Sequence, residues 1–284
     1  MQVIPEIRPG QSIELLKELH ILTRDGKLNQ DSRRKLKQVY HLYQFIEPLL
    51  TSLIQARGGS QDQQGIRLVD HGAGKSYLGF ILHDLFFKNL HDGSHIYGIE
   101  SRAELVDKSA ALAERLQFSG MSFLALTVAE AITSDLLPAR IDIVTALHAC
   151  NTATDDAIRF ALKREATHIV LVPCCQAEVA SVLNRLKGKS LGNNVLTELW
   201  RHPLHTREFG SQLTNVLRCL QLEAHGYQVS VTELVGWEHS MKNELIIATQ
   251  KHLPTRRPAQ RLHEILETVG LTEDMAERFF VPAG

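Results

Sequence analysis

Apolar residues near the start of the chain recur at steps of three and four. Within residues 31–54 the repeat consists of Leu36, Val39, Tyr43, Ile46, Leu50 and Leu53. Because this spacing places the side chains on one face of an α-helix, it predicts a helix that is capped near Asp31 or Ser32. The glycine pair Gly58-Gly59, followed by Ser60, is expected to end this helix.

From residue 66 onward the pattern changes to short apolar runs separated by amphipathic stretches. The runs predict strands at Ile66–Asp70, Ile96–Glu100, Phe123–Thr127, Ile141–Leu147 and His168–Val172. The amphipathic stretches predict helices at Ser76–Phe87, Ala103–Phe118 and Thr154–Lys163. Continuously apolar strands that alternate with helices indicate βαβ units, and therefore a parallel sheet with helices on both faces.

The segment after residue 173 has no clear periodicity until a helix that we predict at Gln212–His225. Two more strands are predicted at Gln228–Leu234 and Glu244–Thr249. Since a parallel crossover needs about a dozen residues or more, these two strands should be antiparallel. The expected fold is α/β, with a mostly parallel seven-stranded sheet, a terminal antiparallel hairpin and N-terminal helices.

This pattern suggests three parts of the chain. We expect an N-terminal helical extension at residues 1–60 and a central domain at 61–254, with an insertion at about 176–207. A helical tail is expected at residues 255–284.

Composition and charge narrow the class of protein. The chain has 284 residues, of which 44% are hydrophobic and 22% charged, as in ordinary globular proteins. Its 31 basic and 32 acidic residues give a net charge of −1, which argues against a strongly basic DNA-packaging role. The N-terminus lacks the apolar core of a signal peptide, and no apolar run is long enough to span a membrane.

The cysteines agree with a reducing compartment. The four residues Cys150, Cys174, Cys175 and Cys219 do not have the spacing of a disulfide framework. We therefore expect a soluble, cytoplasmic protein.

A glycine-containing turn carries the strongest chemical signal. A predicted strand ends in Asp70, glycines follow at Gly72 and Gly74, and a predicted helix begins at Ser76. The two glycines let the backbone turn tightly and approach a ligand closely. About thirty residues further on, the next strand ends in Glu100, where an acid suits the two hydroxyls of a ribose.

Three kinds of ligand compete for this turn. A phosphate-binding P-loop would need a glycine where Val69 stands, although Gly74-Lys75-Ser76 matches the end of that motif. A dinucleotide site would need a third glycine where the bulky Tyr77 stands. S-adenosyl-L-methionine (SAM) needs only the tight turn and the ribose-binding acid, and both are present. A turn that binds no ligand is a fourth interpretation.

The plan of the chain resembles that of the class I SAM-dependent methyltransferases, whose parallel sheet also ends in a reversed hairpin. Over about residues 31–250 it is similar to a methyltransferase-domain family. This family includes the methyltransferase module of the glutathione S-transferase C-terminal domain-containing protein and the eukaryotic tRNA 2′-O-methyltransferases. The resemblance rests on Asp70-His71-Gly72-Ala73-Gly74-Lys75, Gly98-Ile99-Glu100, Leu147-His148-Ala149-Cys150 with Thr154-Asp155, and Val172-Pro173-Cys174-Cys175. One departure is Asn151, which stands where many relatives carry glycine.

The resemblance implies an enzyme that transfers a methyl group from SAM to a macromolecule. RNA, such as tRNA or rRNA, is the favoured acceptor, and a protein is the alternative. A SAM-binding scaffold without turnover is a further alternative. No metal and no membrane contact is expected. The residues expected to contact the cofactor are Asp70, Gly72, Gly74, Ser76, Tyr77, Glu100, Val128, Ala129, Leu147 and His148.

Several side chains are candidates for a catalytic role, and the sequence does not choose among them. His148, Cys150, Cys174 and Cys175 lie near the carboxyl ends of predicted strands, where open α/β sheets bind ligands. The cysteines suit a nucleophile, a zinc site with His148, or simple packing of the pocket. His148 suits either a base or a buried, hydrogen-bonded histidine.

The segment between the last two predicted strands offers two more candidates. Lys242 and His239 either orient or deprotonate the acceptor, or are solvated charges of a turn. Because methyl transfer from SAM is an in-line displacement, positioning of the acceptor matters more than acid–base help.

Basic residues gather in three places along the chain. Each cluster suits RNA phosphates or an ordinary solvated surface. The clusters are Arg33-Arg34-Lys35 with Lys37, Arg185 with Lys187 and Lys189, and Arg256-Arg257 with Arg261.

Overall fold

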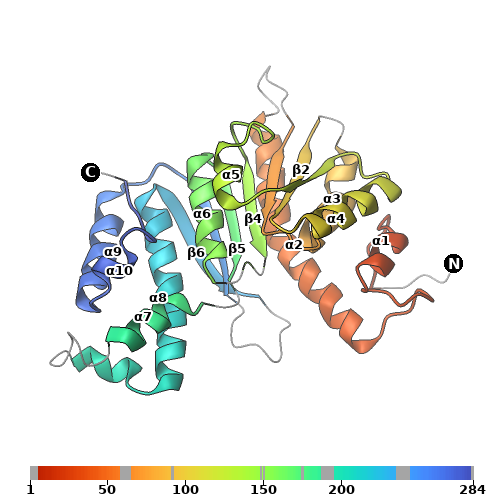
Figure 1. Ribbon diagram of the computed structural model, residues 1–284. Coiled ribbons are helices and arrows are strands. Elements are labelled where there is room, and N and C mark those ends of the chain that lie inside the picture. Colours follow the sequence, from red (N-terminus) through yellow and green to blue (C-terminus); the bar gives the residue numbers. More distant parts are fainter. Residues whose placement is uncertain are drawn as a thin grey trace.

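A seven-stranded sheet lies at the centre of the computed structural model (Figure 1). The structure describes residues 6–57, 65–90, 93–147, 149, 151–173, 176–186, 195–234 and 244–282. The strand order across the sheet is β3-β2-β1-β4-β5-β7-β6. The strands are β1 (Arg67–His71), β2 (His95–Glu100), β3 (Met121–Ala125), β4 (Ile143–Leu147), β5 (His168–Val172), β6 (Tyr227–Glu233) and β7 (Glu244–Gln250).

The direction of the strands confirms the fold expected from the sequence. Strands β1 to β5 are parallel to one another, whereas β7 pairs antiparallel with β5 and β6 pairs antiparallel with β7. The first three strands proceed outward from β1, and the chain then returns to place β4 on the other side of β1. The carboxyl ends of β1 to β5 meet at one edge of the sheet, which we call the carboxyl edge. Open α/β sheets bind ligands at this edge, where the strand order reverses.

Successive side chains of a strand point to opposite faces of the sheet, so both faces are apolar. Helices cover both faces, and the result is two hydrophobic clusters. Leu68 and Ile96 pack with the N-terminal helices and the first two crossover helices, while Val69 and Ile99 pack with the later ones. The first group comprises α1 (Ile13–Glu18), α2 (Gln30–Arg57), α3 (Tyr77–Leu85) and α4 (Ala103–Arg115). The second group comprises α5 (Val128–Thr133), α6 (Ala153–Lys163) and α8 (Pro203–Ala224). A short 3₁₀ helix, η1 (Phe87–Asn89), follows α3.

Helix α2 extends further in both directions than its apolar repeat predicts. The side chain of Asn29 accepts the Ser32 N–H at 2.8 Å, so Asn29 caps the helix rather than Asp31 or Ser32. The helix continues to Arg57, and the glycine pair expected to end it lies outside the described residues. The first turns of α2 project beyond the carboxyl edge (Figure 1).

The third strand ends two residues earlier than predicted, at Ala125. Thr127, which we expected at its end, instead caps α5. Its hydroxyl accepts the Glu130 N–H at 3.4 Å, and the Glu130 carboxylate accepts the Thr127 N–H at 2.7 Å. This capping box starts α5 at Val128, so the chain leaves the sheet instead of extending the strand to Thr127.

The segment that follows β5 is helical, in contrast to the irregular structure expected from its sequence. It forms α7 (Glu178–Leu186) and the 3₁₀ helix η2 (Val195–Trp200), and α8 starts at Pro203 rather than near Gln212. Buried residues of α7 and α8 pack with the two C-terminal helices, α9 (Arg256–Thr268) and α10 (Thr272–Met275). Among the helices that the structure describes, none has the length and apolar character needed to cross a membrane.

Candidate functional site

The turn between β1 and α3 has the left-handed backbone that its glycines permit. Gly72 and Gly74 have φ angles of +67° and +57°, in the left-handed region that glycine adopts without steric cost. Ser76 also has a positive φ, of +49°. The Ala73 N–H donates to the carbonyl of Ile99 at 2.9 Å, which holds the turn against the end of β2.

Asp70 lies beneath this turn and is only 2% exposed. Its carboxylate accepts the Thr145 hydroxyl at 2.9 Å, the Ser76 hydroxyl at 3.4 Å and the Gly79 N–H. Burial raises the pKa of Asp70 to about 6, although these hydrogen bonds oppose the rise. Asp70 therefore stabilises the turn through these hydrogen bonds.

Two further glycines allow this close packing: Gly79, which the sequence analysis did not single out, and Gly98, which it used only for the resemblance. A Cβ on Gly79 would lie 2.5 Å from the Ser76 hydroxyl oxygen, and a Cβ on Gly98 would lie 2.6 Å from the ring of Phe123. Gly79 thus lets α3 approach β1 closely. In a dinucleotide-binding motif the third glycine, which would stand at position 77 here, has this role. A small residue inside the first helical turn was the available signal.

Tyr77, which we expected to contact the cofactor, points toward the N-terminal segment. Its hydroxyl donates to the carbonyl of Leu19, just after α1. The Tyr77 side chain therefore joins α1 to α3, and only its backbone lies at the glycine turn.

Glu100 joins the end of β2 to the glycine turn. One carboxylate oxygen accepts the Gly74 N–H at 2.9 Å, and the other accepts the Arg102 N–H at 3.1 Å. The Arg102 guanidinium donates to both oxygens, at 2.9 and 3.1 Å. The hydrogen bonds from the Arg102 guanidinium, together with those from the backbone N–H groups of Arg102 and Gly74, hold the pKa of Glu100 at about 2. The site therefore presents an ionised carboxylate beside the turn.

The surrounding residues leave room for a nucleoside cofactor. A Cβ on Gly74 would meet no atom of the described residues within 4 Å, so these residues leave the space above the turn open. Ala125 is the register partner of Glu100, and Val128 and Ala129 follow it in the first turn of α5. Leu147 ends β4 at the same edge. An ionised acid beside exposed turn backbone fits the ribose and the amino-acid part of SAM.

His71 is a site residue whose character the sequence did not reveal. The ring is 4% exposed and lies 5.6 Å from the ring of Phe160, between centroids. Neither ring nitrogen has a hydrogen-bond partner in the part of the chain that the structure describes. Burial lowers the pKa of His71 to about 4, so the ring is neutral near pH 7.

The candidate catalytic residues fall outside the described part of the chain. These are His148, Cys150, Cys174, Cys175, His239 and Lys242. Their roles, including the alternative zinc site, stay predictions. Elsewhere, the described residues contain no group of three or more His, Cys, Asp or Glu side chains that could hold a metal ion. Cys219 lies half-buried in α8, and burial raises the pKa of its thiol to about 12.

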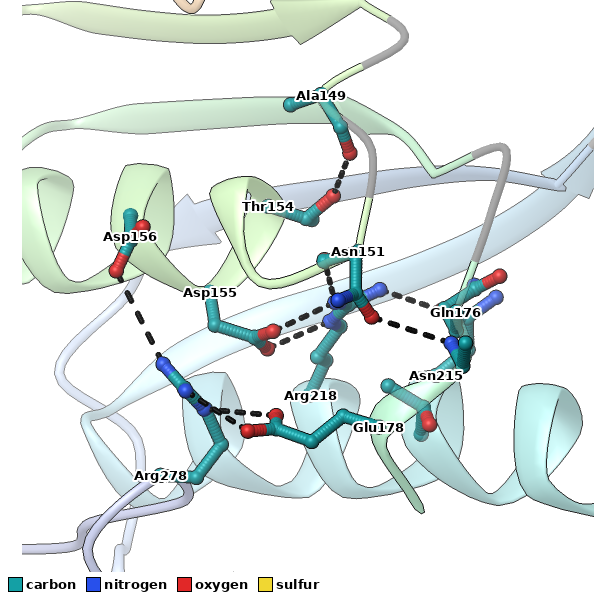
Figure 2. Close-up of polar contacts among 12 residues, drawn as sticks. Ala149, Asn151, Thr154, Asp155, Asp156, Gln176, Glu178, Asn215, Arg218 and Arg278 are labelled. Carbon is teal, nitrogen blue, oxygen red and sulfur yellow. Dashed lines mark hydrogen bonds and ion pairs between the residues drawn. The ribbon is translucent and has the colours of Figure 1, made fainter. Parts of the chain in front are cut away.

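A buried polar network lies beneath the other half of the carboxyl edge (Figure 2). The fully buried Arg218 donates to both carboxylate oxygens of Asp155, each at 2.7 Å. It also donates to the carbonyl of Asn151 at 3.0 Å and to the side-chain oxygen of Asn215 at 3.1 Å. Because Asp155 is in the first turn of α6, this network fixes the start of that helix to α8.

Asn151 connects the segment after β4 to the segment after β5. Its side-chain oxygen accepts the Ala177 N–H at 3.1 Å (Figure 2). Its φ angle is +53°, a left-handed conformation that asparagine tolerates better than most residues. Asn151 can therefore adopt the kind of backbone for which the resemblance leads us to expect glycine here. The Thr154 hydroxyl donates to the Ala149 carbonyl at 2.6 Å and closes the turn.

A second ion pair connects the C-terminal tail to the same region. Arg278 donates to both carboxylate oxygens of Glu178, at 2.9 and 3.0 Å, and lies 3.9 Å from Asp156 (Figure 2). The tail therefore contacts both α6 and α7 close to the network of Arg218.

Comparison with known proteins gives the same class as the fold and the site. A methyltransferase-domain family matches residues 34–182, just over half of the chain, and the chain belongs to this family. With the seven-stranded fold, this membership defines a class I SAM-dependent methyltransferase whose cofactor is SAM. No curated protein sequence matches the chain.

Several solved structures are similar to the chain at low sequence identity. Magnesium protoporphyrin IX methyltransferase from Synechocystis, with bound SAH, is 14% identical, with a TM-score of 0.44 over 84% of this chain and 93% of that one. An rRNA methylase from Streptococcus thermophilus is 12% identical, with a TM-score of 0.40 over 68% and 89%. Fibrillarin from Aeropyrum pernix, with bound SAM, is 13% identical, with a TM-score of 0.39 over 66% and 67%.

Proposed function

We propose that this methyltransferase modifies RNA. The observation that carries the proposal is the basic cluster on the first turns of α2, which project beyond the carboxyl edge (Figure 1). All four basic side chains are exposed, and two of them, Arg33 and Arg34, lie near Glu6 and Asp31. Lys35 and Lys37 have no acidic partner among the described residues, so they are available to bind phosphates.

The other basic clusters support this proposal less. Arg185, at the end of α7, forms an ion pair with Asp274. Arg256, Arg257 and Arg261 are exposed on α9, which lies on the opposite side of the sheet from α2 (Figure 1). We therefore assign RNA binding to the α2 cluster.

The geometry of the described residues supports the cofactor contacts that we propose. Arg102 is 63% exposed and can move away, so that the Glu100 carboxylate accepts the ribose hydroxyls in its place. The backbone of the turn from Gly72 to Ser76 holds the amino-acid part, with Asp70 supporting it from below. Val128 and Ala129 flank the adenine, and Leu147 lies near the transferred methyl; for His148, which follows Leu147, the same role stays a prediction from the sequence. When bound, SAM supplies an electrophilic methyl group.

The experiment that tests this function follows the methyl group itself. Purified protein is incubated with methyl-labelled SAM and a cell extract, which is then treated with ribonuclease or with protease. RNA methylation predicts a label that ribonuclease releases and protease does not. A label released only by protease would replace RNA with the protein alternative, and SAM binding without any transfer would favour a scaffold.

Variants of the basic cluster test where the RNA binds. The double change Lys35→Gln and Lys37→Gln should weaken RNA binding and lower the slope of log affinity against log salt by about 1 to 2, because two phosphate contacts are lost. The matched control, Arg256→Gln with Arg257→Gln, removes the same charge from α9 and should leave the slope unchanged. Equal effects of the two double variants would overturn the assignment.

A further inference from the structure

A second cavity lies at the carboxyl edge, beside the proposed methyl position. It has a volume of about 510 Å³ and is bounded by α8, the ends of β6 and β7, and Pro173, which directly follows β5. Val172, the last residue of β5, is the register partner of Leu147 at the end of β4. The cavity therefore begins about one strand spacing, ~4.8 Å, from the point where β4 ends.

Buried polar side chains form one wall of this cavity. Gln176, Ser211 and Asn215 are each less than 10% exposed and line the cavity. The Ser211 hydroxyl donates to the Gln176 side-chain oxygen at 3.0 Å, and the Gln176 amide donates to the Asn215 oxygen at 2.6 Å. The Asn215 amide in turn donates to the Glu244 carboxylate. These bonds fix the polar groups before any ligand arrives.

The charge of the cavity limits what can enter it. Three carboxylates line the walls: Glu208, Glu233 and Glu244. Glu208 is paired with Arg207 at 2.9 Å, whereas Glu233 and Glu244 contact no cation among the described residues. No lysine or arginine of the described chain lines the walls. The cavity therefore repels phosphate and favours a group that donates N–H hydrogen bonds.

Building on RNA as the acceptor, we propose that this cavity receives the target nucleobase, and that the base carries an exocyclic amino group. Guanine, adenine and cytosine have such a group, which a carboxylate can bind, whereas uracil presents one ring N–H between two carbonyl oxygens that a carboxylate repels. The volume suits a single small ligand, which here is a base turned out of its strand. The phosphates stay outside, where Lys35 and Lys37 are available.

This placement puts the methyl group on the base rather than on the ribose. A nitrogen lone pair of the base forms the new bond to the methyl carbon, and the electrons of the broken carbon–sulfur bond return to sulfur. That nitrogen is the exocyclic amino nitrogen, which then loses one of its protons to water, so that charge and atoms balance.

The first test locates the methyl group in the product. RNA labelled by the enzyme is digested to nucleosides, and mass spectrometry then distinguishes methyl on the base from methyl on the ribose. We expect base methylation, with poly(U) a much poorer substrate than poly(A) or poly(C). Ribose methylation, or equal use of poly(U), would overturn the cavity proposal and leave RNA methylation intact. A label found only on protein side chains would overturn both.

The second test uses the cavity carboxylates. Glu233→Gln changes an exposed side chain and is expected to lower kcat/KM for RNA at least fivefold through a higher KM, while KM for SAM stays within twofold. Glu244→Gln should lower it more, because Glu244 also holds Asn215. The matched control Glu273→Gln alters an exposed glutamate on α10 and should change neither constant. Wild-type RNA kinetics in Glu233→Gln, or an equal loss in the control, would contradict the proposal.

Discussion

The carboxyl edge has two halves: the cofactor half, with the glycine turn after β1, and the half formed by the segments after β4 and β5. A buried carboxylate stabilises each half, but the two carboxylates have different partners. Asp70, beneath the glycine turn, meets two hydroxyls and a backbone N–H. Asp155, beneath the segment after β4, meets the guanidinium of Arg218. The first carboxylate holds one local turn, whereas the second fixes α6 to α8 and, through Asn151, the segment after β5.

This difference has an energetic consequence. Hydroxyls and N–H groups do not neutralise a carboxylate, so the buried charge of Asp70 is costly, and its pKa rises to about 6. The pair of Asp155 and Arg218 carries no net charge, but either partner left alone would be a buried, unpaired ion. The contribution of the cofactor half to the free energy of unfolding should therefore depend on pH. The contribution of the other half should depend on whether both Asp155 and Arg218 are present.

Removal of Arg218 should have the largest effect. Arg218→Met leaves the Asp155 carboxylate buried without a cation, which we expect to lower the free energy of unfolding by about 3–5 kcal/mol. Urea denaturation measures this change. The exposed Arg201→Met variant serves as the control and should stay within about 0.5 kcal/mol of the wild type. The double variant Asp155→Leu with Arg218→Met should recover most of the loss. A double variant as unstable as Arg218→Met alone would refute the unpaired-charge explanation.

The cofactor half should show its dependence on pH through Asp70. Because the folded-state pKa is about 6 and the ordinary value is 3.8, the folded protein holds this proton more tightly than the unfolded chain does. The contribution of Asp70 to the free energy of unfolding should fall as pH rises from about 4 to 7, by up to about 3 kcal/mol. Asp70→Asn removes the titrating group, so the stability difference between variant and wild type should change with pH over this range. A stability difference that stays constant with pH would contradict the burial of the Asp70 carboxylate without a cation beside it.

A smaller effect is expected from the close packing above Asp70. Gly79→Ala places a Cβ against the Ser76 hydroxyl and should lower the free energy of unfolding by about 1–3 kcal/mol. Ser76→Ala removes that oxygen, so the double variant should be less destabilised than the sum of the two single changes. Strict additivity in thermal or urea unfolding would show that the two residues do not meet.

The two halves also differ in how far the sequence could predict them. Asp70, Gly72 and Gly74 belong to one local strand–turn–helix pattern, and the acid at Glu100 ends the next strand. Their proximity follows from the parallel order of β1 and β2, which the apolar runs predicted. Gly79 and the capping role of Thr127 depend on local packing and on competing hydrogen bonds, which periodicity does not reveal.

The Arg218 network could not be predicted from the sequence in this way. Arg218 and Asp155 are separated by 63 residues, and no spacing rule connects a position in α8 with the start of α6. Helix α7 was missed although Val179, Val182, Leu183 and Leu186 recur at steps of three and four, so a local signal for this helix was present in the sequence. The tertiary fold, rather than any local pattern, brings these groups together.

The most direct test of the site is a calorimetric titration of SAM into the wild-type protein and into Glu100→Ala, with the exposed Glu104→Ala as the control. ATP and NAD are titrated in parallel. We predict micromolar binding of SAM to the wild type and the control, and no binding of ATP or NAD. Affinity for SAM should be at least tenfold weaker in Glu100→Ala, because charge-assisted hydrogen bonds to the ribose are lost. Equal SAM affinity in Glu100→Ala and the wild type, or binding of ATP or NAD without SAM, would contradict the placement of the cofactor between the glycine turn and Glu100.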